Sequence, residues 1–288
     1  MLGEAMHVLA IDGGGSKTEA ALLAPDGTEL ARSRVGPCNL YRDAEAGVAA
    51  LIEGWHGCCG AGEPAADAVI VSAGLAGLGA AGAADRVREA LAGFARVHLS
   101  SDGYVALAGA FGAQPGALVV AGTGVAGLAR SADGWVRSAS GWGFPAGDRG
   151  GGAWLGFALV QRWLERLDGY PGPDSRLWSD VAGLAGTERP AILAWLRRAD
   201  PADFAALAPA ITTAGDCLAD ELLDEAAGHL VRLVRAIRPV DAPLAMTGGL
   251  AAALAPRVEA AFGPVRLGAC PLLGAWRIAR GEVPAELP

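Results

Sequence analysis

Three short apolar runs at the start of the chain predict an antiparallel sheet. Residues 7–11, 18–23 and 29–35 favour extended structure. A glycine-rich turn follows the first run, and Pro25-Asp26-Gly27 makes a tight hairpin after the second. Helix and strand patterns then alternate, beginning with a helix, at residues 48–55, 68–73, 87–94, 97–100 and 102–111. The order βββαβαβα predicts a mixed α/β unit.

The pattern begins again after Gln114-Pro115-Gly116. Residues 117–121 form a buried-type strand that ends at Gly122-Thr123-Gly124, and 125–130 and 135–140 continue it around an Asp-Gly turn. We interpret this as an internal duplication of a supersecondary unit. It predicts an N-terminal domain over residues 1–115 and a C-terminal domain over 116–288.

The remainder of the chain is mostly helical. A long apolar stripe runs from Leu218 to Ile237, and a short strand at 244–247 leads into Gly248-Gly249. The last helix begins after Cys270. We expect the C-terminal domain to carry helical additions, with the last helix free to pack back on the N-terminal domain.

Composition narrows the class of protein. The chain has 288 residues, 52% hydrophobic, and a formal net charge of −8 with no basic block, which argues against a nucleic-acid or anionic-membrane partner. Five cysteines without a CxxC pair fit neither a disulfide framework nor a zinc knuckle. Because no signal peptide or membrane span is evident, we expect a cytoplasmic protein.

Three glycine turns suggest a site for a nucleoside triphosphate. Glycine lets backbone N–H groups approach phosphate oxygens without a β-carbon in the way. Asp12 precedes the first turn and is placed to hold Mg²⁺, while Ser16 and Lys17, the only lysine, could contact phosphates. Each turn taken alone is better explained as an ordinary tight turn, and it is the three turns in this order that favour the nucleotide site. The chain has no P-loop or Rossmann motif, so these two nucleotide folds are poor fits.

Five segments taken together resemble the N-acetylglucosamine kinase and BadF/BcrA-type ATPase family, within the actin, hexokinase and sugar-kinase superfamily. They are Ile11-Asp12-Gly13-Gly14-Gly15-Ser16-Lys17-Thr18, Ser100-Ser101-Asp102, Ala121-Gly122-Thr123-Gly124, Gly141-Trp142-Gly143-Phe144-Pro145-Ala146-Gly147-Asp148 and Met246-Thr247-Gly248-Gly249. The resemblance implies an α/β fold of two RNase-H-like (actin-like ATPase) domains, with ATP and sugar meeting in an inter-domain cleft.

The resemblance also implies roles for individual residues. Asp12 would hold Mg²⁺, and ATP would be bound by Gly13, Gly14, Gly15, Ser16, Lys17, Thr18, Gly122, Thr123, Gly124, Gly248 and Gly249. The sugar would be bound by Asn39, Gly77, Asp102, Thr123, Gly124, Trp142 and Asp148. Asp102 would be the catalytic base that takes the proton of the sugar hydroxyl. The alternative readings are a helix N-cap for Asp102 and core packing for Trp142.

Two positions depart from the family pattern. Arg149 stands where the family usually has an acid, and it could bind phosphate, pair with Asp148 or be solvated. Ala76 offers no side-chain donor in the expected sugar loop. Both departures leave the choice of hexosamine, and whether it is N-acetylated, open.

The function expected from these residues is an ATP-dependent kinase that phosphorylates glucosamine or N-acetylglucosamine, at the 6-hydroxyl. A homodimer is compatible with the sequence. One alternative is the dehydratase-activator branch of the family, which needs cluster-ligating cysteines beside the second phosphate loop, where this chain has none. Another is a non-catalytic regulator that binds sugar or nucleotide, which would be expected to lack the base.

Overall fold

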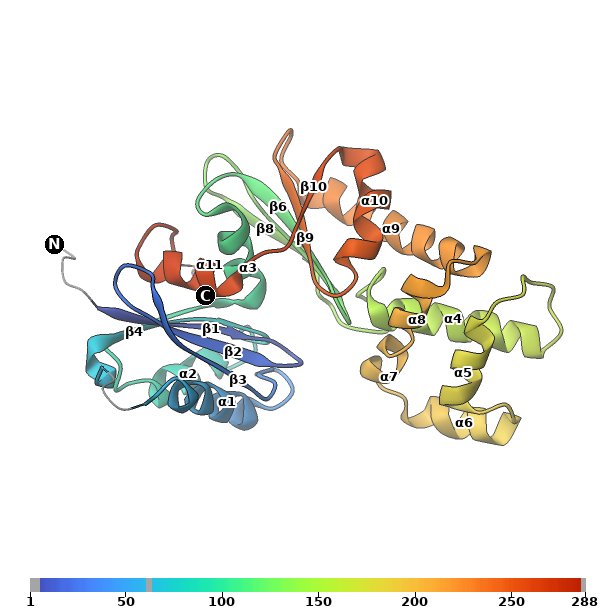
Figure 1. Ribbon diagram of the computed structural model, residues 1–288, viewed down its shortest axis with the longest axis horizontal. Coiled ribbons are helices and arrows are strands. Elements are labelled where there is room, and N and C mark those ends of the chain that lie inside the picture. The colour runs from blue at the N-terminus through green and yellow to red at the C-terminus, as the bar shows by residue number, and fades with distance from the viewer. Residues whose placement is uncertain (1–5, 61–63, 286–288) are drawn as a thin grey trace. The chain divides into compact units, whose positions relative to one another are not determined.

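The computed structural model describes residues 6–60 and 64–285 (Figure 1). The chain forms two compact units, the first from residues up to Gln114 together with the segment from Ala269 onward, the second from Pro115–Gly268. Each unit contains a five-stranded sheet. The C-terminal segment therefore belongs to the first unit and not to the one that precedes it in sequence.

The sheet of the first unit mixes antiparallel and parallel strands. Its order is β3-β2-β1-β4-β5. β1 pairs antiparallel with β2, and β2 with β3, whereas β1 pairs parallel with β4, and β4 with β5. This confirms the predicted antiparallel hairpins at the start of the chain. The strands are His7–Gly13, Thr18–Leu23, Glu29–Val35, Val69–Leu75 and Arg96–Ser101 for β1 to β5.

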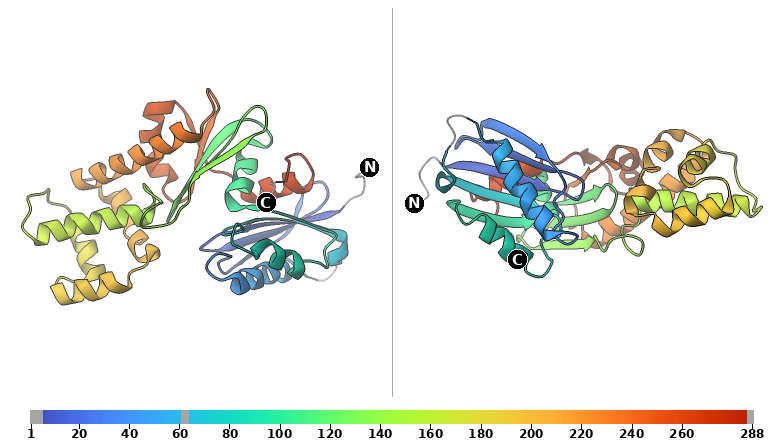
Figure 2. Two further views of the ribbon diagram at one scale, coloured as in Figure 1. Left: turned by 180° about the vertical axis from the view of Figure 1, so that it is seen from behind. Right: turned by 90° about the horizontal axis from the view of Figure 1, so that it is seen from below.

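Helices cover both faces of this sheet (Figure 1, Figure 2). α1 (Ala44–Gly57) and α2 (Ala83–Ala90) lie on one face, over a core that includes Leu9 and Ile11 of β1. α3 (Asp102–Phe111) and α11 (Pro271–Ala279) lie on the other, and η1 (Ala66–Ala68) precedes β4. Because side chains alternate along a strand, β1 supplies apolar residues to both layers.

One predicted helix is shorter than its apolar spacing suggested. The pattern at residues 87–94 predicts a helix to Phe94, but α2 ends at Ala90. The chain turns after Leu91, and Phe94 packs edge-on against Trp55 of α1, with ring centroids 5.1 Å apart. The apolar spacing at residues 87–94 therefore arises from the buried face of a helix and from the buried residues of the turn that follows it.

The second unit repeats the strand order of the first. Its sheet runs β10-β9-β6-β7-β8, with β6 and β9 parallel at the centre. In chain order, β6 to β10 correspond to β1 to β5. With these counterparts the second sheet has the order β5-β4-β1-β2-β3, which is the order of the first sheet read from its other edge. This confirms the internal duplication. The strands are Gly116–Ala121, Val125–Arg130, Val136–Ser140, Leu244–Thr247 and Val265–Leu267 for β6 to β10.

Most of the helical additions lie between β8 and β9. α9, which carries the predicted apolar stripe, packs against β7 and β8, and α4 packs against α7, α8 and α9. No helix in the described part of the chain is both long enough and apolar enough to span a membrane. The helices are Gly152–Leu167, Leu177–Ala185, Arg189–Arg198, Pro201–Ala205, Ala208–Ala214, Cys217–Ile237 and Ala251–Phe262 for α4 to α10.

Candidate functional site

The predicted site residues of the first unit gather at one edge of its sheet. Strands β1, β4 and β5 are parallel, and Asp12, Gly74 and Ser100 are successive partners across them. Their carboxyl ends therefore meet at the same edge. Asp12 lies near the end of β1, and Asp102 directly follows β5. The topology thus brings together two carboxylates that are 90 residues apart in sequence.

The carboxyl group of Asp12 lies within the electrostatic influence of Asp102. The pKa of Asp12 is raised to about 6, first by burial, then by the negative charges of Asp102 and Glu19, and Lys17 lowers it in part. Both causes disfavour the ionised form of the acid. A cation bound at this edge would offset the negative charges and favour the ionised form of Asp12. Asp12 is therefore suited to hold a divalent ion.

A magnesium site here would depend on water ligands. Within residues 6–60 and 64–285 no group of three or more His, Cys, Asp or Glu side chains could hold a metal ion. Mg²⁺ commonly binds through one or two carboxylates and keeps several waters. The Asp12 and Asp102 pair fits that mode and supplies the negative charge for it.

Asp102 does not cap the helix that it begins. The N-cap of α3 is Ser101, whose side-chain oxygen accepts a hydrogen bond from the backbone N–H of Tyr104 at 3.3 Å. The N-cap reading of Asp102 is therefore wrong, because the preceding serine satisfies that amide. The Asp102 Oδ1 instead accepts from the N–H of Gly103 at 2.8 Å.

The carboxyl group of Asp102 is available to a ligand and is a stronger base than an ordinary aspartate. The residue is exposed. Protein atoms around the carboxyl group nevertheless displace enough water to raise its pKa, and the Gly103 N–H opposes this in part. A raised pKa brings a carboxylate closer to the strength that a base needs near neutral pH.

The first glycine loop is held open by backbone contacts. Gly14 N–H donates to the carbonyl of Lys17, and the carbonyl of Gly14 accepts from the N–H of Cys38, both at 2.9 Å. A β-carbon on Gly13 would lie 2.8 Å from Cδ2 of Leu75 and 3.1 Å from Cβ of Cys38, so a larger residue there would have to displace these side chains. Gly15 and Ser16 are exposed, which leaves their N–H groups accessible. The loop is thus shaped to present amides outward.

The two other predicted phosphate residues of this loop differ in accessibility. Lys17 is half-exposed and forms an ion pair with Glu19 of β2, which Arg32 also approaches at 3.6 Å. Thr18 is fully buried, and its hydroxyl has no hydrogen-bond partner among the described residues. Lys17 can reach a ligand by leaving Glu19, whereas Thr18 faces the interior. Glu19 is a residue that the sequence analysis missed, although its pairing with Asp12 follows from the hairpin register.

Asn39 and Gly77 lie together beside this loop. The backbone of Asn39 forms an isolated parallel β-bridge with Ala76. The side-chain oxygen of Asn39 accepts hydrogen bonds from the N–H groups of Tyr41 and Arg42, at 3.1 and 3.2 Å. A β-carbon on Gly77 would stand 2.4 Å from the backbone nitrogen of Tyr41. The amide nitrogen of Asn39 would lie 3.8 Å from a β-carbon on Gly15. The side chain therefore has its Nδ2 donor directed toward the glycine loop.

In the second unit the two other glycine turns are neighbours. Val120 of β6 pairs in parallel with Thr247 of β9, so both turns follow the same edge of the sheet. Gly248 has a φ of 98°, and a β-carbon there would lie 2.3 Å from the carbonyl oxygen of Ala121. The carbonyls of Gly122 and Thr123 accept from the first amides of α4 at 2.8 and 2.9 Å. This fixes the second loop on the helix.

Asp148 and Trp142 belong to one loop between β8 and α4. A β-carbon on Gly124 would lie 2.4 Å from Oδ2 of Asp148, so this carboxylate rests against the second glycine loop. Trp142 is 88% exposed, which shows that the core-packing reading is wrong. Phe144 anchors the loop by packing on Phe157 and Phe204, with centroids 5.5 and 5.4 Å apart. The loop thus presents an exposed indole.

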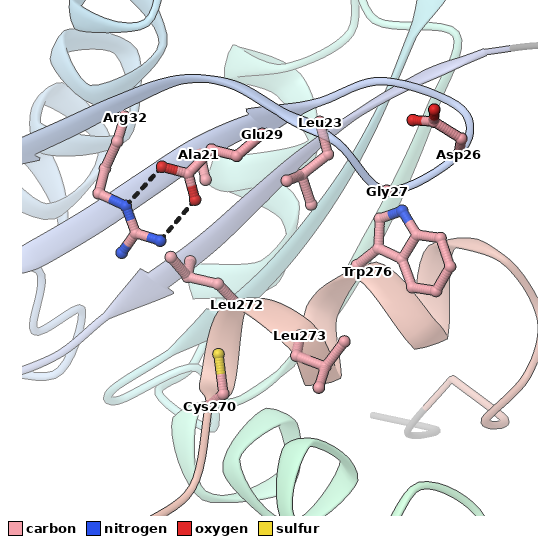
Figure 3. Close-up of a pocket in the computed structure, with 10 residues that line it drawn as sticks. All are labelled: Ala21, Leu23, Asp26, Gly27, Glu29, Arg32, Cys270, Leu272, Leu273 and Trp276. Carbon is pink, nitrogen blue, oxygen red and sulfur yellow. Dashed lines mark hydrogen bonds and ion pairs between the residues drawn. The ribbon is translucent and has the colours of Figure 1, made fainter.

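A separate cavity of the first unit contains none of the predicted site residues (Figure 3). Its volume is about 360 Å³, and it lies between the β2–β3 hairpin and α11. Leu23 and Leu272 contribute to its apolar lining, and Arg32 donates to Glu29 at 2.9 and 2.6 Å along one side. Its two acidic residues already have partners: Glu29 pairs with Arg32, and Asp26 accepts a hydrogen bond from the N–H of Thr28 at 2.9 Å.

Comparison with known proteins gives consistent results. The family profile described as BadF/BadG/BcrA/BcrD ATPase matches residues 9–260. The glucosamine kinase GspK of Vibrio cholerae is 28% identical over 230 residues, which cover 78% of each protein. A solved structure from Chromobacterium violaceum, provisionally described as an N-acetylglucosamine kinase, is 35% identical with a TM-score of 0.86 and covers 95% of this chain and 99% of its own.

A more distant structure shares the fold alone. A ROK family glucokinase from Streptomyces griseus, solved with glucose and AMPPNP, is 17% identical with a TM-score of 0.56 and covers 96% of this chain and 99% of its own. Together with the two five-stranded sheets, these similarities confirm the predicted α/β fold of two actin-like ATPase domains.

Proposed function

Because this chain belongs to the BadF/BadG/BcrA/BcrD ATPase family, we propose that it is an ATP-dependent kinase that phosphorylates glucosamine or N-acetylglucosamine. The family alone does not decide between phosphorylating a sugar and hydrolysing ATP for another purpose. The observation that favours the kinase is the pair Asp12 and Asp102 at one sheet edge, one suited to a metal and the other exposed to a ligand. The similarity to a glucosamine kinase supports the same choice.

In this proposal Asp102 is the general base. Its carboxylate takes the proton of the sugar hydroxyl, while that oxygen forms a bond to the γ-phosphorus and the bond from phosphorus to the leaving ADP oxygen breaks. Ser101 caps α3, so the Asp102 carboxylate is not needed for that purpose. The 6-hydroxyl, the primary and least hindered one, is the expected acceptor.

Asp12 would hold Mg²⁺ through water. Bound there, the ion would neutralise charge on the phosphate oxygens. Asp12 would hold this ion at the end of β1, and Lys17 could exchange its ion pair with Glu19 for a phosphate oxygen. The N–H groups of Gly14 and Gly122 donate to carbonyls of their own loops, so the amides of Gly15, Ser16, Thr123 and Gly124 would bind the phosphate chain. Gly248 and Gly249 would border the nucleoside.

The sugar would be recognised by hydroxyl contacts and one aromatic surface. Asn39 has its Nδ2 free to donate, and Asp148 can accept from vicinal hydroxyls. The exposed indole of Trp142 can cover an apolar face of a pyranose. Gly77 leaves room for backbone contact. With Asp102 and Asp148 among them, these residues suit a neutral or aminated hexose better than an anionic substrate.

The test is a substrate panel. Purified protein with Mg·ATP is assayed for ADP release with glucosamine, N-acetylglucosamine, N-acetylmannosamine, glucose and buffer. We expect glucosamine or N-acetylglucosamine to raise ADP release well above buffer, with a 6-phosphate as the product by ³¹P NMR. Equal ADP release with every sugar and with buffer would contradict the kinase activity and indicate an ATPase. Faster ADP release with glucose than with the amino sugars would support a sugar kinase but contradict the preference for an amino sugar.

A further inference from the structure

Nitrogen donors gather where the loop before α4 lies against α9. A β-carbon on Gly150 would stand 2.8 Å from the carbonyl oxygen of Ala226 and 3.4 Å from Cβ of His229. The neighbouring residue Arg149 is therefore held beside His229, although its side chain is exposed. Arg232, one turn further along α9, donates to His229. Two guanidinium groups thus flank one imidazole.

His229 completes this cluster as a neutral donor. Arginine can only donate, so the Nδ1 of His229 accepts from Arg232 and the Nε2 of the neutral ring carries the hydrogen. Its pKa is lowered to about 4, first by burial and then by the charges of Arg149 and Arg232. The ring packs edge-on against Trp154 of α4, with centroids 4.8 Å apart. It is therefore fixed in place with a donor nitrogen.

The positive charge of this cluster is uncompensated within residues 6–60 and 64–285. No described carboxylate forms an ion pair with Arg149 or Arg232. Glu225, one turn before His229, is occupied by Arg162 at 2.6 Å. Asp148 rests against Gly124 and forms no ion pair with Arg149. The sequence analysis left three roles open for Arg149, and this excludes pairing with Asp148.

We propose that Arg149, Arg232 and His229 form a binding site for a phosphate group, carried by a phosphate monoester or free as inorganic phosphate. Guanidinium groups match phosphate oxygens in a bidentate geometry, and two of them balance the charge of a dianion. The first amides of α4 are occupied by Gly122 and Thr123, so the side chains, not the helix end, supply the donors.

The monoester source rests on the proposed function, since a sugar kinase releases a phosphate monoester. Arg149 directly follows Asp148, the proposed sugar contact. A phosphorylated product held there would leave slowly and would compete with new sugar. The site would then make the enzyme sensitive to its own product, and inorganic phosphate would produce the same inhibition in weaker form.

The test measures binding without turnover. The full-length protein, without ATP or sugar, is titrated calorimetrically with inorganic phosphate and separately with glucosamine 6-phosphate. Wild type is compared with Arg149→Gln, Arg232→Gln and the double variant. Arg235→Gln is the control, because Arg235 is another exposed arginine of α9. Each single variant should weaken binding by about tenfold, as expected for loss of one charged hydrogen-bonding partner, and the control should not.

The two titrations distinguish the source. Tighter binding of the sugar phosphate identifies the product, whereas equal binding of both ligands identifies free phosphate, and the arginine dependence supports the site in either case. No binding of either ligand, unchanged binding in both arginine variants, or an equal loss in Arg235→Gln would overturn it. Since no turnover is involved, a protein that phosphorylates no amino sugar would still give a clear answer.

Discussion

Gly274 of α11 lies so close to Val105 of α3 that a β-carbon at position 274 would stand 1.8 Å from the Val105 carbonyl oxygen. Gly109 makes the reciprocal approach, with the carbonyl oxygen of Cys270 at 2.1 Å from its would-be β-carbon. The Val105 side chain in turn occupies the space beside Gly74 of β4, where a β-carbon would stand 2.1 Å from its Cγ2. Close backbone contact therefore holds α3 against α11 on the same face of the sheet, and α3 begins at Asp102.

Replacing Gly274 by alanine should destabilise the protein. The added methyl group must push α3 and α11 apart, and overpacking of this kind typically costs about 1–3 kcal/mol. Urea denaturation measures the change in the free energy of unfolding. Gly228→Ala is the matched control, because Gly228 lies within α9 with open space around it and alanine favours a helix by up to about 1 kcal/mol. A Gly274→Ala protein as stable as wild type would show that the contact is not tight.

Replacing Asp102 by asparagine should abolish most turnover and leave stability nearly unchanged. Asparagine keeps the size of the side chain but cannot accept the hydroxyl proton, and loss of a general base costs about 10²–10⁴ in rate. Steady-state kinetics and thermal melting are measured on the same preparation. Ser101→Ala is the complementary variant, since loss of the N-cap costs about 0.5–2 kcal/mol of stability. Retention of more than about a tenth of wild-type turnover by Asp102→Asn contradicts the base role.

The stability of the protein should depend on pH through Asp12. Its pKa rises from an ordinary 3.8 to about 6 on folding, so the folded state binds more protons between these values. Stability from this group is therefore greatest below pH 4 and falls as the pH rises toward 6, by at most about 3 kcal/mol. Asp12→Asn should be more stable than wild type at pH 8 and equal to it near pH 4.

Magnesium provides the control for this pH effect. Mg²⁺ alone should raise the melting temperature of wild type at pH 8, because a bound cation offsets the charge of Asp12 and Asp102. It should not raise the melting temperature of Asp12→Asn. A Mg²⁺ effect of equal size in both proteins would place the ion elsewhere.

Replacing Gly124 by alanine should impair sugar binding through Asp148. The new β-carbon would stand 2.4 Å from Oδ2 of Asp148 and displace this carboxylate. We expect the KM for the amino sugar to rise by about tenfold, the loss of one good hydrogen bond to a charged group. Gly122→Ala is the control in the same loop, since no atom lies within 4 Å of its added β-carbon. Equal KM values for the sugar in the two variants would show that Asp148 does not contact the sugar.

The sequence by itself determined the repeated strand pattern, the glycine turns and the family. Alternating apolar runs and Asp-Gly or Gly-rich turns are local signals, so they predicted β1 to β3 and β6 to β8 without knowledge of distant contacts. The motif around Asp12 and the Gly141 to Asp148 block carried the resemblance for the same reason. Each of these features depends on only a few consecutive residues.

Only the tertiary structure decided which of these residues meet. Which serine or aspartate caps α3 depends on backbone angles at a single turn, and either Ser101 or Asp102 satisfied the sequence pattern. Asp102 acts on Asp12 because β1 and β5 flank β4, and Arg149 lies beside His229 because a loop packs on a helix about 80 residues later. Such contacts result from burying apolar faces shared by distant segments, and no local pattern records which faces will pair.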